Sequence, residues 1–213
     1  MAIEVEARFR VTDASAVTRL SSIDRLGPAE LGPPAAFEQT DEYLDTADGL
    51  LAAARWACRL RQRDGVAIVS LKGPPEPDTD GWLHRRPELE GPATSDPDPA
   101  GWPASDARAL LDTLRGGHPL AVQVTLRQHR TERSVTVEGV RTGVLSLDHV
   151  VVASPDAPVG AFGIVELELA GQAGAPHLPA LAAALGSIGG LVAEPRSKLE
   201  AALELLGSVT GPG

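Results

Sequence analysis

Cysteine, aromatic residues and lysine are all scarce in this chain of 213 residues. The single cysteine, Cys58, cannot form a disulfide within the chain, and the sequence has no paired cysteines at a zinc-binding spacing. No apolar run is long enough to cross a bilayer, and the first residues carry charges where a signal peptide would be apolar. We therefore expect a cytoplasmic protein with no membrane partner.

Positive charge is also in deficit, because 19 basic residues face 29 acidic residues and the formal net charge is −10. A protein that grips nucleic acid through its phosphates usually carries the opposite excess. Aromatic residues make up only 3% of the chain, which leaves little material for stacking bases. We therefore predict no nucleic-acid partner. The length suits one large domain or two small ones.

Strand patterns dominate the chain, and turn residues separate them. Apolar and charged residues alternate from Ile3 to Val11, and Asp64-Gly65 is a strong hairpin signal. Strands are predicted over residues 3–11, 37–45, 56–63, 66–72, 83–90, 120–130, 134–138, 144–152 and 163–170, and helical segments over 14–26, 50–55, 105–114, 177–188 and 197–206. About eight strands with helices between and after them predict an α+β fold with a closed or nearly closed antiparallel barrel.

Charged residues recur at every second position along several of these strands. They are Glu4, Glu6 and Arg8; Arg59, Arg61 and Arg63; Arg86, Glu88 and Glu90; and Glu166 and Glu168. A solvated outer face would explain any one of these strands, since the exposed face of an antiparallel sheet is polar. Four such strands, built almost wholly from arginine and carboxylate, favour charges that point into the barrel. The only two lysines, Lys72 and Lys198, are candidates for the same cavity.

Charges inside a barrel need compensation, because an unpaired buried ion costs several kcal/mol. Arginine and lysine match a multiply charged oxyanion such as a phosphate. Carboxylates beside them would repel that anion unless divalent cations lie between, and Mg²⁺ typically binds carboxylates, waters and substrate phosphates together. A barrel of about eight strands is wide enough for one small ligand. The residues alone therefore predict a metal-assisted polyphosphate site.

The same residues resemble the motifs of the CYTH family, the triphosphate tunnel metalloenzymes, from Glu4 to about Leu206. The segment 4–8 is similar to the family's E-x-E-x-K signature, with Arg8 in place of the lysine. The likeness continues in L-R-x-R at 60–63, L-K-x-P at 71–74, R-x-E-x-E at 86–90, a strand arginine at 130, L-D at 147–148, E-x-E at 166–168 and S-K-L at 197–199. The segment Tyr43-Leu44-Asp45-Thr46 is similar to the family's Y-x-D-T.

The resemblance implies one eight-stranded tunnel domain over residues 1–207, with a short flexible tail over 208–213. It implies hydrolysis of a small triphosphate, either inorganic or organic such as thiamine triphosphate, with Mg²⁺ or Mn²⁺. The implied phosphate-binding residues are Arg8, Arg61, Arg63, Lys72, Arg86, Arg130 and Lys198, with Arg59 as a further candidate on the same face. The implied metal ligands are Glu4, Glu6, Asp148, Glu166 and Glu168, of which all but Asp148 are also candidate catalytic residues, while Glu88 and Glu90 would line the cavity.

Two other functions stay open at this point. The scaffold also resembles class IV adenylate cyclases, which would need a base-and-ribose pocket at the tunnel mouth. The alternative outside enzymes is a sensor that binds polyphosphate or nucleotide without turnover. Arg8, which keeps the charge but not the compact ammonium, favours the sensor, whereas the complete set of acidic positions favours hydrolysis. A homodimer is a possible assembly.

Overall fold

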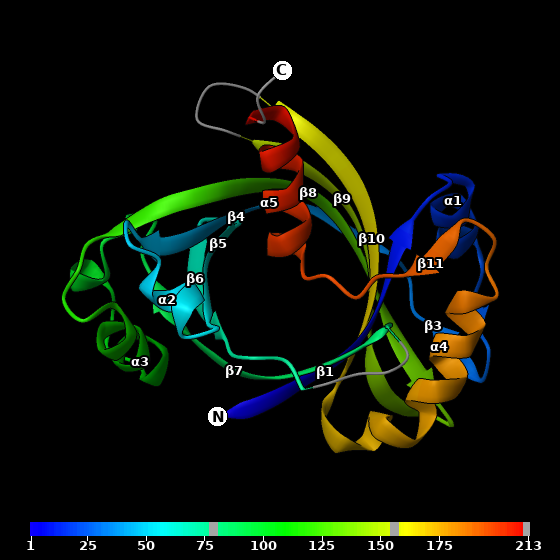
Figure 1. Cartoon of the computed structure of the whole chain (residues 1–213). Coiled ribbons are helices and arrows are strands. Elements are labelled where there is room, and N and C mark those ends of the chain that lie inside the picture. Colours follow the sequence, from blue (N-terminus) through cyan, green and yellow to red (C-terminus); the bar gives the residue numbers. More distant parts are fainter. Residues whose placement is uncertain (77–80, 154–157, 211–213) are drawn as a thin grey trace.

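A computed structural model of the chain describes residues 1–76, 81–153 and 158–210 (Figure 1). The strands are β1 (Ala2–Val11), β2 (Arg25–Leu26), β3 (Ala29–Leu31), β4 (Ala35–Thr46), β5 (Ala57–Arg63), β6 (Val66–Lys72), β7 (Leu83–Ala93), β8 (Leu120–Val137), β9 (Val140–Ala153), β10 (Pro158–Leu169) and β11 (Leu191–Ala193). The helices are α1 (Ser15–Ser22), α2 (Leu50–Ala53), α3 (Asp106–Arg115), α4 (Leu178–Gly186) and α5 (Lys198–Thr210), with two 3₁₀ segments, η1 (Pro99–Gly101) and η2 (Gly171–His177).

Eight of the strands close into an antiparallel barrel (Figure 1). Their order is β8-β4-β5-β6-β7-β1-β10-β9, and β9 pairs back onto β8 from Thr125↔Ala153 to Val137↔Val140. The short strands β2 and β3 extend the sheet beside β8, and β11 pairs with β1. The predicted α+β fold with an eight-stranded antiparallel barrel and flanking helices is confirmed.

Helices cover the outer face of the barrel at two places. On one side, Phe9 of β1 packs in a buried cluster with Leu20 of α1 and Leu185 of α4. On the other, Leu60 of β5 packs with residues of α2 and α3, including Leu111. Because side chains alternate along a strand, these outward apolar residues leave the charged residues between them facing the interior.

Helix α5 crosses one end of the barrel (Figure 1). Its Ala202 is fully buried in a cluster with Tyr43, Leu126 and Val150, which lie on β4, β8 and β9. An apolar helix face therefore occupies this end. The β5–β6 hairpin lies toward the opposite end of the barrel, because the register places Arg59 beside Tyr43 and Gln62, near the turn, beside Thr40. Within the described residues, no helix is long and apolar enough to cross a membrane.

Some local predictions are wrong. Strands predicted over 120–130 and 134–138 form the single strand β8, because pairing with β9 continues through the charged residues between them. The helix predicted over 14–26 ends at Ser22, and Arg25 and Leu26 pair with β3 instead. Strand β11 was not predicted. The expected tail over 208–213 begins inside α5, and its last three residues lie outside the described residues.

Candidate functional site

A cavity of about 450 Å³ lies inside the barrel, and charged side chains line it. The lining includes these residues singled out from the sequence: Glu4, Glu6, Arg8, Arg59, Arg61, Arg63, Lys72, Arg86, Glu88, Glu90, Arg130, Glu166, Glu168 and Lys198. Asp148 is the one candidate that does not line it, because it lies buried behind Arg130 and Lys198. Charges from strands far apart in the sequence thus converge inside one closed barrel.

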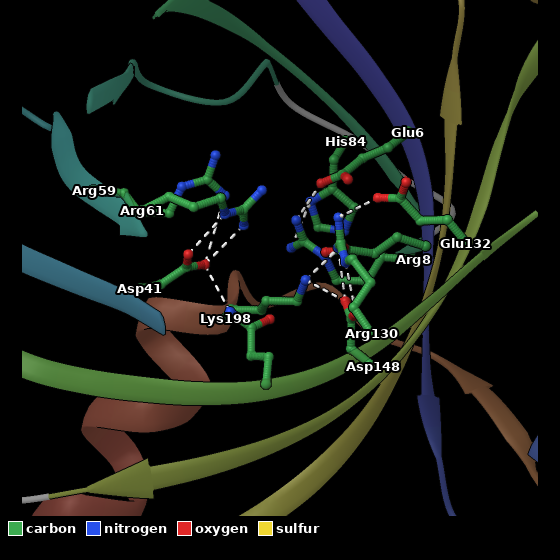
Figure 2. A network of polar contacts seen from close by, with 12 residues as sticks. Glu6, Arg8, Asp41, Arg59, Arg61, His84, Arg130, Glu132, Asp148 and Lys198 are labelled. Atoms are coloured by element: carbon green, nitrogen blue, oxygen red, sulfur yellow. Dashed lines mark hydrogen bonds and ion pairs between the residues drawn. The ribbon is translucent and has the colours of Figure 1, made fainter. Parts of the chain in front are cut away.

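One buried part of this network joins two carboxylates to two cations (Figure 2). Lys198 Nζ donates to Asp148 Oδ2 and Glu166 Oε2, both at 2.6 Å. Arg130 donates to both oxygens of Asp148 at 2.7 Å and to Glu166 Oε2 at 2.9 Å. Burial alone would raise the pKa of Glu166, but the charges of Lys198 and its neighbouring arginines hold that pKa well below its usual range. Both carboxylates are therefore kept ionised.

Arg8 is held by the protein on nearly all its donors (Figure 2). It is 1% exposed, and its Nε donates to Glu166 Oε1 at 3.1 Å. Nη1 donates to the carbonyl oxygen of Arg196 at 2.7 Å, and Nη2 pairs with Glu6. Arg8 therefore ties the carboxylates of β1 and β10 to the segment that leads into α5. Its expected contact with phosphate stays a prediction.

Asp41, which was not among the residues predicted from the sequence, is fully buried on β4 (Figure 2). Arg61 donates to its two oxygens from Nε at 2.7 Å and from Nη2 at 2.8 Å, and Gln128 Nε2 donates to Oδ2 at 2.7 Å. Burial would raise the pKa of Asp41, but the hydrogen bond from Arg61 and the charge of Arg59 lower it. Its position two residues before Tyr43, on the same face of an alternating strand, was the available signal. Glu132, which lines the cavity two residues after Arg130, was missed as well.

Glu4 lies between two cations on the β1, β6 and β7 side of the cavity. Lys72 Nζ is 2.5 Å from Glu4 Oε1, and Arg86 Nε is 2.8 Å from Glu4 Oε2. Burial opposes ionisation here too, but Lys72 and Arg86 lower the pKa of Glu4 below its usual range. Lys72 also lies 3.1 Å from Glu88. This side of the cavity is therefore a second network of paired charges.

Glu168 differs from the other glutamates of the cavity, because no cation lies within ion-pair distance of it among the described residues. It stands directly opposite Glu6 in the pairing of β1 with β10. Its side chain is exposed to the tunnel interior, but protein atoms of the tunnel wall surround it on most sides. This partial burial, together with the negative charges of Glu4 and Glu6, raises the pKa of Glu168 to about 7. Like charges placed opposite each other favour a shared cation.

The carboxylates fit a hard divalent cation in part. Carboxylate oxygens are the donors that Mg²⁺ and Mn²⁺ prefer, and Mg²⁺ usually keeps several waters with one or two carboxylates. Glu6 and Glu168 match that donor set. Within the described ranges, no three acidic, histidine or cysteine side chains surround one point. Glu166 and Asp148 are occupied by Arg130 and Lys198, so their expected role as metal ligands stays a prediction.

Several buried polar atoms of the tunnel strands have no hydrogen-bond partner in the described part of the chain. Two of them belong to residues that line the cavity, Nε of Arg59 and Oε1 of Glu88, of which the Glu88 oxygen still lies 3.1 Å from Lys72 Nζ in an ion pair. The others are amide atoms of Gln39 and Gln128. Buried polar groups are normally satisfied. The Nε of Arg59 and the two glutamine amides, which have no partner here, are consistent with a wall that completes its hydrogen bonds with a polar ligand or with water.

Two residues of the Y-x-D-T segment have different roles, one at the cavity and one at the start of a helix. Tyr43 lines the cavity, whereas Asp45 turns away toward helix α2. The Asp45 carboxylate accepts from the backbone N–H groups of Thr46, Leu51 and Ala52 at 2.7, 2.9 and 3.0 Å. Such bonds satisfy the free N–H groups at a helix start. This aspartate therefore has a structural role.

Comparison with known proteins gives a family match and a set of similar folds. The profile of the CYTH domain matches residues 2–185. A search of curated protein sequences finds no match. Among solved structures, HpAC1 from Hippeastrum, described as an adenylyl cyclase candidate with a dominant triphosphatase activity, has a TM-score of 0.68 and 22% identity over 94% of this chain and 95% of that one. A Bacillus halodurans protein described as a candidate adenylate cyclase has a TM-score of 0.56 and 20% identity over 94% and 98% of the two chains. PH1819 from Pyrococcus horikoshii has a TM-score of 0.56 and 18% identity over 93% and 98%.

Proposed function

The chain belongs to the CYTH family, and from this premise we propose that it hydrolyses a small linear triphosphate in a metal-dependent reaction that releases phosphate. The observation that carries the proposal is the convergence of arginines, lysines and carboxylates on one cavity inside a closed barrel. A triphosphate is small, extended and highly anionic, and this is the ligand that such a lining suits. HpAC1, which shares the fold, is described with a triphosphatase activity, and this description is compatible with the proposal.

Basic side chains on β5, β6 and β7 would bind the phosphate oxygens. Arg59 and Arg61 follow each other on the inward face of β5, and Lys72 and Arg86 lie across the cavity on β6 and β7. Guanidinium groups pair bidentately with phosphate, and fixed cations stabilise the charge that builds up on a transferred phosphoryl group. These residues would orient the triphosphate along the tunnel and stabilise the transition state.

Mg²⁺ or Mn²⁺, when bound, would neutralise phosphate charge and help to supply the attacking water. Glu6 and Glu168 would hold the ion, because they face each other and Glu168 lacks a cationic partner among the described residues. Arg8, Arg130 and Lys198 would act indirectly, by keeping the neighbouring carboxylates ionised and in place. Water attacks directly, so no covalent intermediate with the protein is needed.

Phosphate release tests the proposal most directly. Inorganic triphosphate, thiamine triphosphate and ATP are each incubated with the protein in Mg²⁺, in Mn²⁺ and in chelator, and the products of ATP are identified to separate hydrolysis from cyclisation. We expect metal-dependent release, and we expect Glu168→Gln to reduce it at least about 100-fold with an unchanged circular dichroism spectrum. Glu30→Gln on β3, outside the barrel, is the control and should leave turnover unchanged. Metal-dependent release that persists in Glu168→Gln would contradict the assignment.

Binding without turnover is the second candidate, and the state of Arg8 is the observation that favours it. A guanidinium that is fully engaged with Glu6, Glu166 and a backbone carbonyl has little left for a phosphate. Tight triphosphate binding by calorimetry, with no phosphate release in Mg²⁺ or Mn²⁺, would identify the chain as a sensor.

A further inference from the structure

Two apolar side chains interrupt the charged lining of the tunnel at the end formed by the β5–β6 hairpin. Val66 and Ile68 line the cavity and are 59% and 36% exposed. They share the inward face of β6 with Ser70 and Lys72, which are buried and polar. A phosphate chain gains nothing from aliphatic surface, so these two side chains point to a different part of a ligand.

Arg63 lies beside these two side chains, because it pairs with Val66 across the hairpin. The guanidinium of Arg63 lies over the ring of Phe37, with its central carbon 4.2 Å from the ring centroid. Arg63 lines the cavity and is exposed, and no carboxylate lies within ion-pair distance of it among the described residues. Stacking on the Phe37 ring fixes the orientation of the guanidinium plane. A guanidinium plane is itself a good surface on which a second planar group can stack.

We propose that these four residues, Phe37, Arg63, Val66 and Ile68, form a mouth platform that binds the planar heteroaromatic group of an organic triphosphate. The proposal rests on the proposed function and narrows its substrate class, because inorganic triphosphate has no group to place here. The ring packs against the aliphatic side chains and stacks on the guanidinium. Apolar and aromatic side chains line most small-molecule sites, and here they supply the contact surface for the ring.

The position of the platform matches an extended substrate. Along the inward face of β5, Arg61 lies two residues and Arg59 four residues from Arg63, which is about 7 and 13 Å deeper at the rise of a strand. Lys72 lies at the deep end of β6 in the same way. A ligand with its ring at the mouth therefore has its phosphates beside these cations.

An exposed valine after a hairpin glycine does not by itself indicate a ligand site, and a second valine of the chain shows this. Val140 follows Gly139 at the β8–β9 turn as Val66 follows Gly65, both glycines have φ of 78°, and Val140 is 55% exposed. Val140 does not line the cavity. What distinguishes Val66 is its place on the wall of the charged tunnel, and Val140 supplies a matched control.

The test compares kcat/KM for ATP with kcat/KM for inorganic triphosphate. In the double variant Val66→Ser, Ile68→Ser we expect the ATP-to-inorganic ratio to fall about tenfold, because aliphatic contacts to the ring are lost. Phe37→Leu should lower the ratio in the same direction by releasing the plane of Arg63. Val140→Ser should keep the wild-type ratio, and thermal melting verifies that every variant is folded.

Each outcome decides between the two proposals. An unchanged ratio in the double variant overturns the mouth platform while leaving the triphosphatase in place. If no triphosphate is hydrolysed at all, the proposed function fails, and calorimetric affinities for ATP and inorganic triphosphate then test the platform alone. Selective loss of ATP affinity in the double variant would support it, and equal affinities in wild type and variant would overturn it.

Discussion

Arg133 is a buried arginine that stabilises the fold outside the tunnel. It is 3% exposed on the outward face of β8, and its guanidinium donates to backbone carbonyls rather than to groups that line the tunnel. Nη1 donates to Leu20 O at 2.9 Å and to Ile23 O at 2.6 Å, and Nε donates to Gly32 O at 2.7 Å. These carbonyls belong to the end of α1 and to the turn region after it. One side chain thus satisfies the carbonyls left free where the helix stops.

Replacing this guanidinium should destabilise the fold without touching the tunnel. In Arg133→Met, carbonyls that remain buried lose their donors, and we expect the free energy of unfolding in urea to fall by about 3 kcal/mol. Arg127→Met, on the exposed face of the same strand, is the control and should change it by less than about 0.5 kcal/mol. A loss of similar size in both variants would mean that the hydrogen bonds of Arg133 contribute little.

Glu168 should give the metal-free protein a distinctive pH dependence. Its pKa of about 7 lies above the ordinary value of 4.5, so the folded state holds this proton more tightly than the unfolded state. The stabilisation from this group is complete below pH 4.5 and is lost as the pH rises through 7. We expect Glu168→Gln to gain stability relative to wild type between pH 5 and pH 8, measured by urea unfolding in chelator. A difference that does not change with pH would contradict the raised pKa.

The β5–β6 hairpin places three of the four residues of the mouth platform, Arg63, Val66 and Ile68. Its turn residues Asp64 and Gly65 have φ of 51° and 78°, the left-handed conformation that a two-residue hairpin of this kind requires. Asp-Gly is among the strongest short-range signals for that turn, and the hairpin was predicted at these residues. Local conformational preference therefore determines this turn, while Leu60, Val69 and Leu71 of its strands pack in the core.

A glycine substitution separates backbone strain from packing in this turn. A Cβ at Gly65 would meet no atom within 4 Å, so Gly65→Ala tests the positive φ alone, and we expect it to cost about 1 kcal/mol in urea unfolding. Gly101→Ala is matched, because a Cβ there also meets nothing within 4 Å and its φ is not in the left-handed region. Equal stability of the two variants would refute the assigned strain.

Across the whole molecule, charge is distributed unevenly between the tunnel and the rest of the chain. Among the residues that the structure describes, eight basic and eight acidic side chains line the cavity, whereas the formal net charge of the whole chain is −10. The tunnel therefore has no excess of positive charge with which to attract a polyanion. A triphosphate that enters it alone must displace carboxylates from arginines and lysines, and a divalent cation that enters with it removes that conflict.

Ligand and metal should consequently stabilise the fold together. A ligand at 100 times its Kd adds about 2.7 kcal/mol, which raises the melting temperature of a chain of this size by about 5–10 °C. We expect this shift with inorganic triphosphate and Mg²⁺, and a much smaller one with triphosphate in chelator or with Mg²⁺ alone, in scanning fluorimetry. Orthophosphate with Mg²⁺ is the control. The same shift with and without Mg²⁺ would contradict a cation-bridged ligand.

Much of this molecule could be predicted from local pattern. Alternation of period two placed Glu4, Glu6 and Arg8 on one strand face, a turn dipeptide placed the β5–β6 hairpin, and ordered motifs indicated the family. Such features depend on residues close together in the chain, so a single sequence carries them. The inward direction of the charged side chains and the closure of the barrel depend on several strands together, so no single strand pattern predicts them.

The folded barrel decides which charged side chains of the tunnel pair with one another. Nothing local to Asp41 indicates that Arg61 and Gln128 will donate to it, because those residues lie on two other strands that pair with β4. The engagement of Arg8 by Glu166 and the withdrawal of Asp148 behind Arg130 arise in the same way. Strand order and register bring such groups within about 3 Å, and a charge pattern along one strand specifies neither.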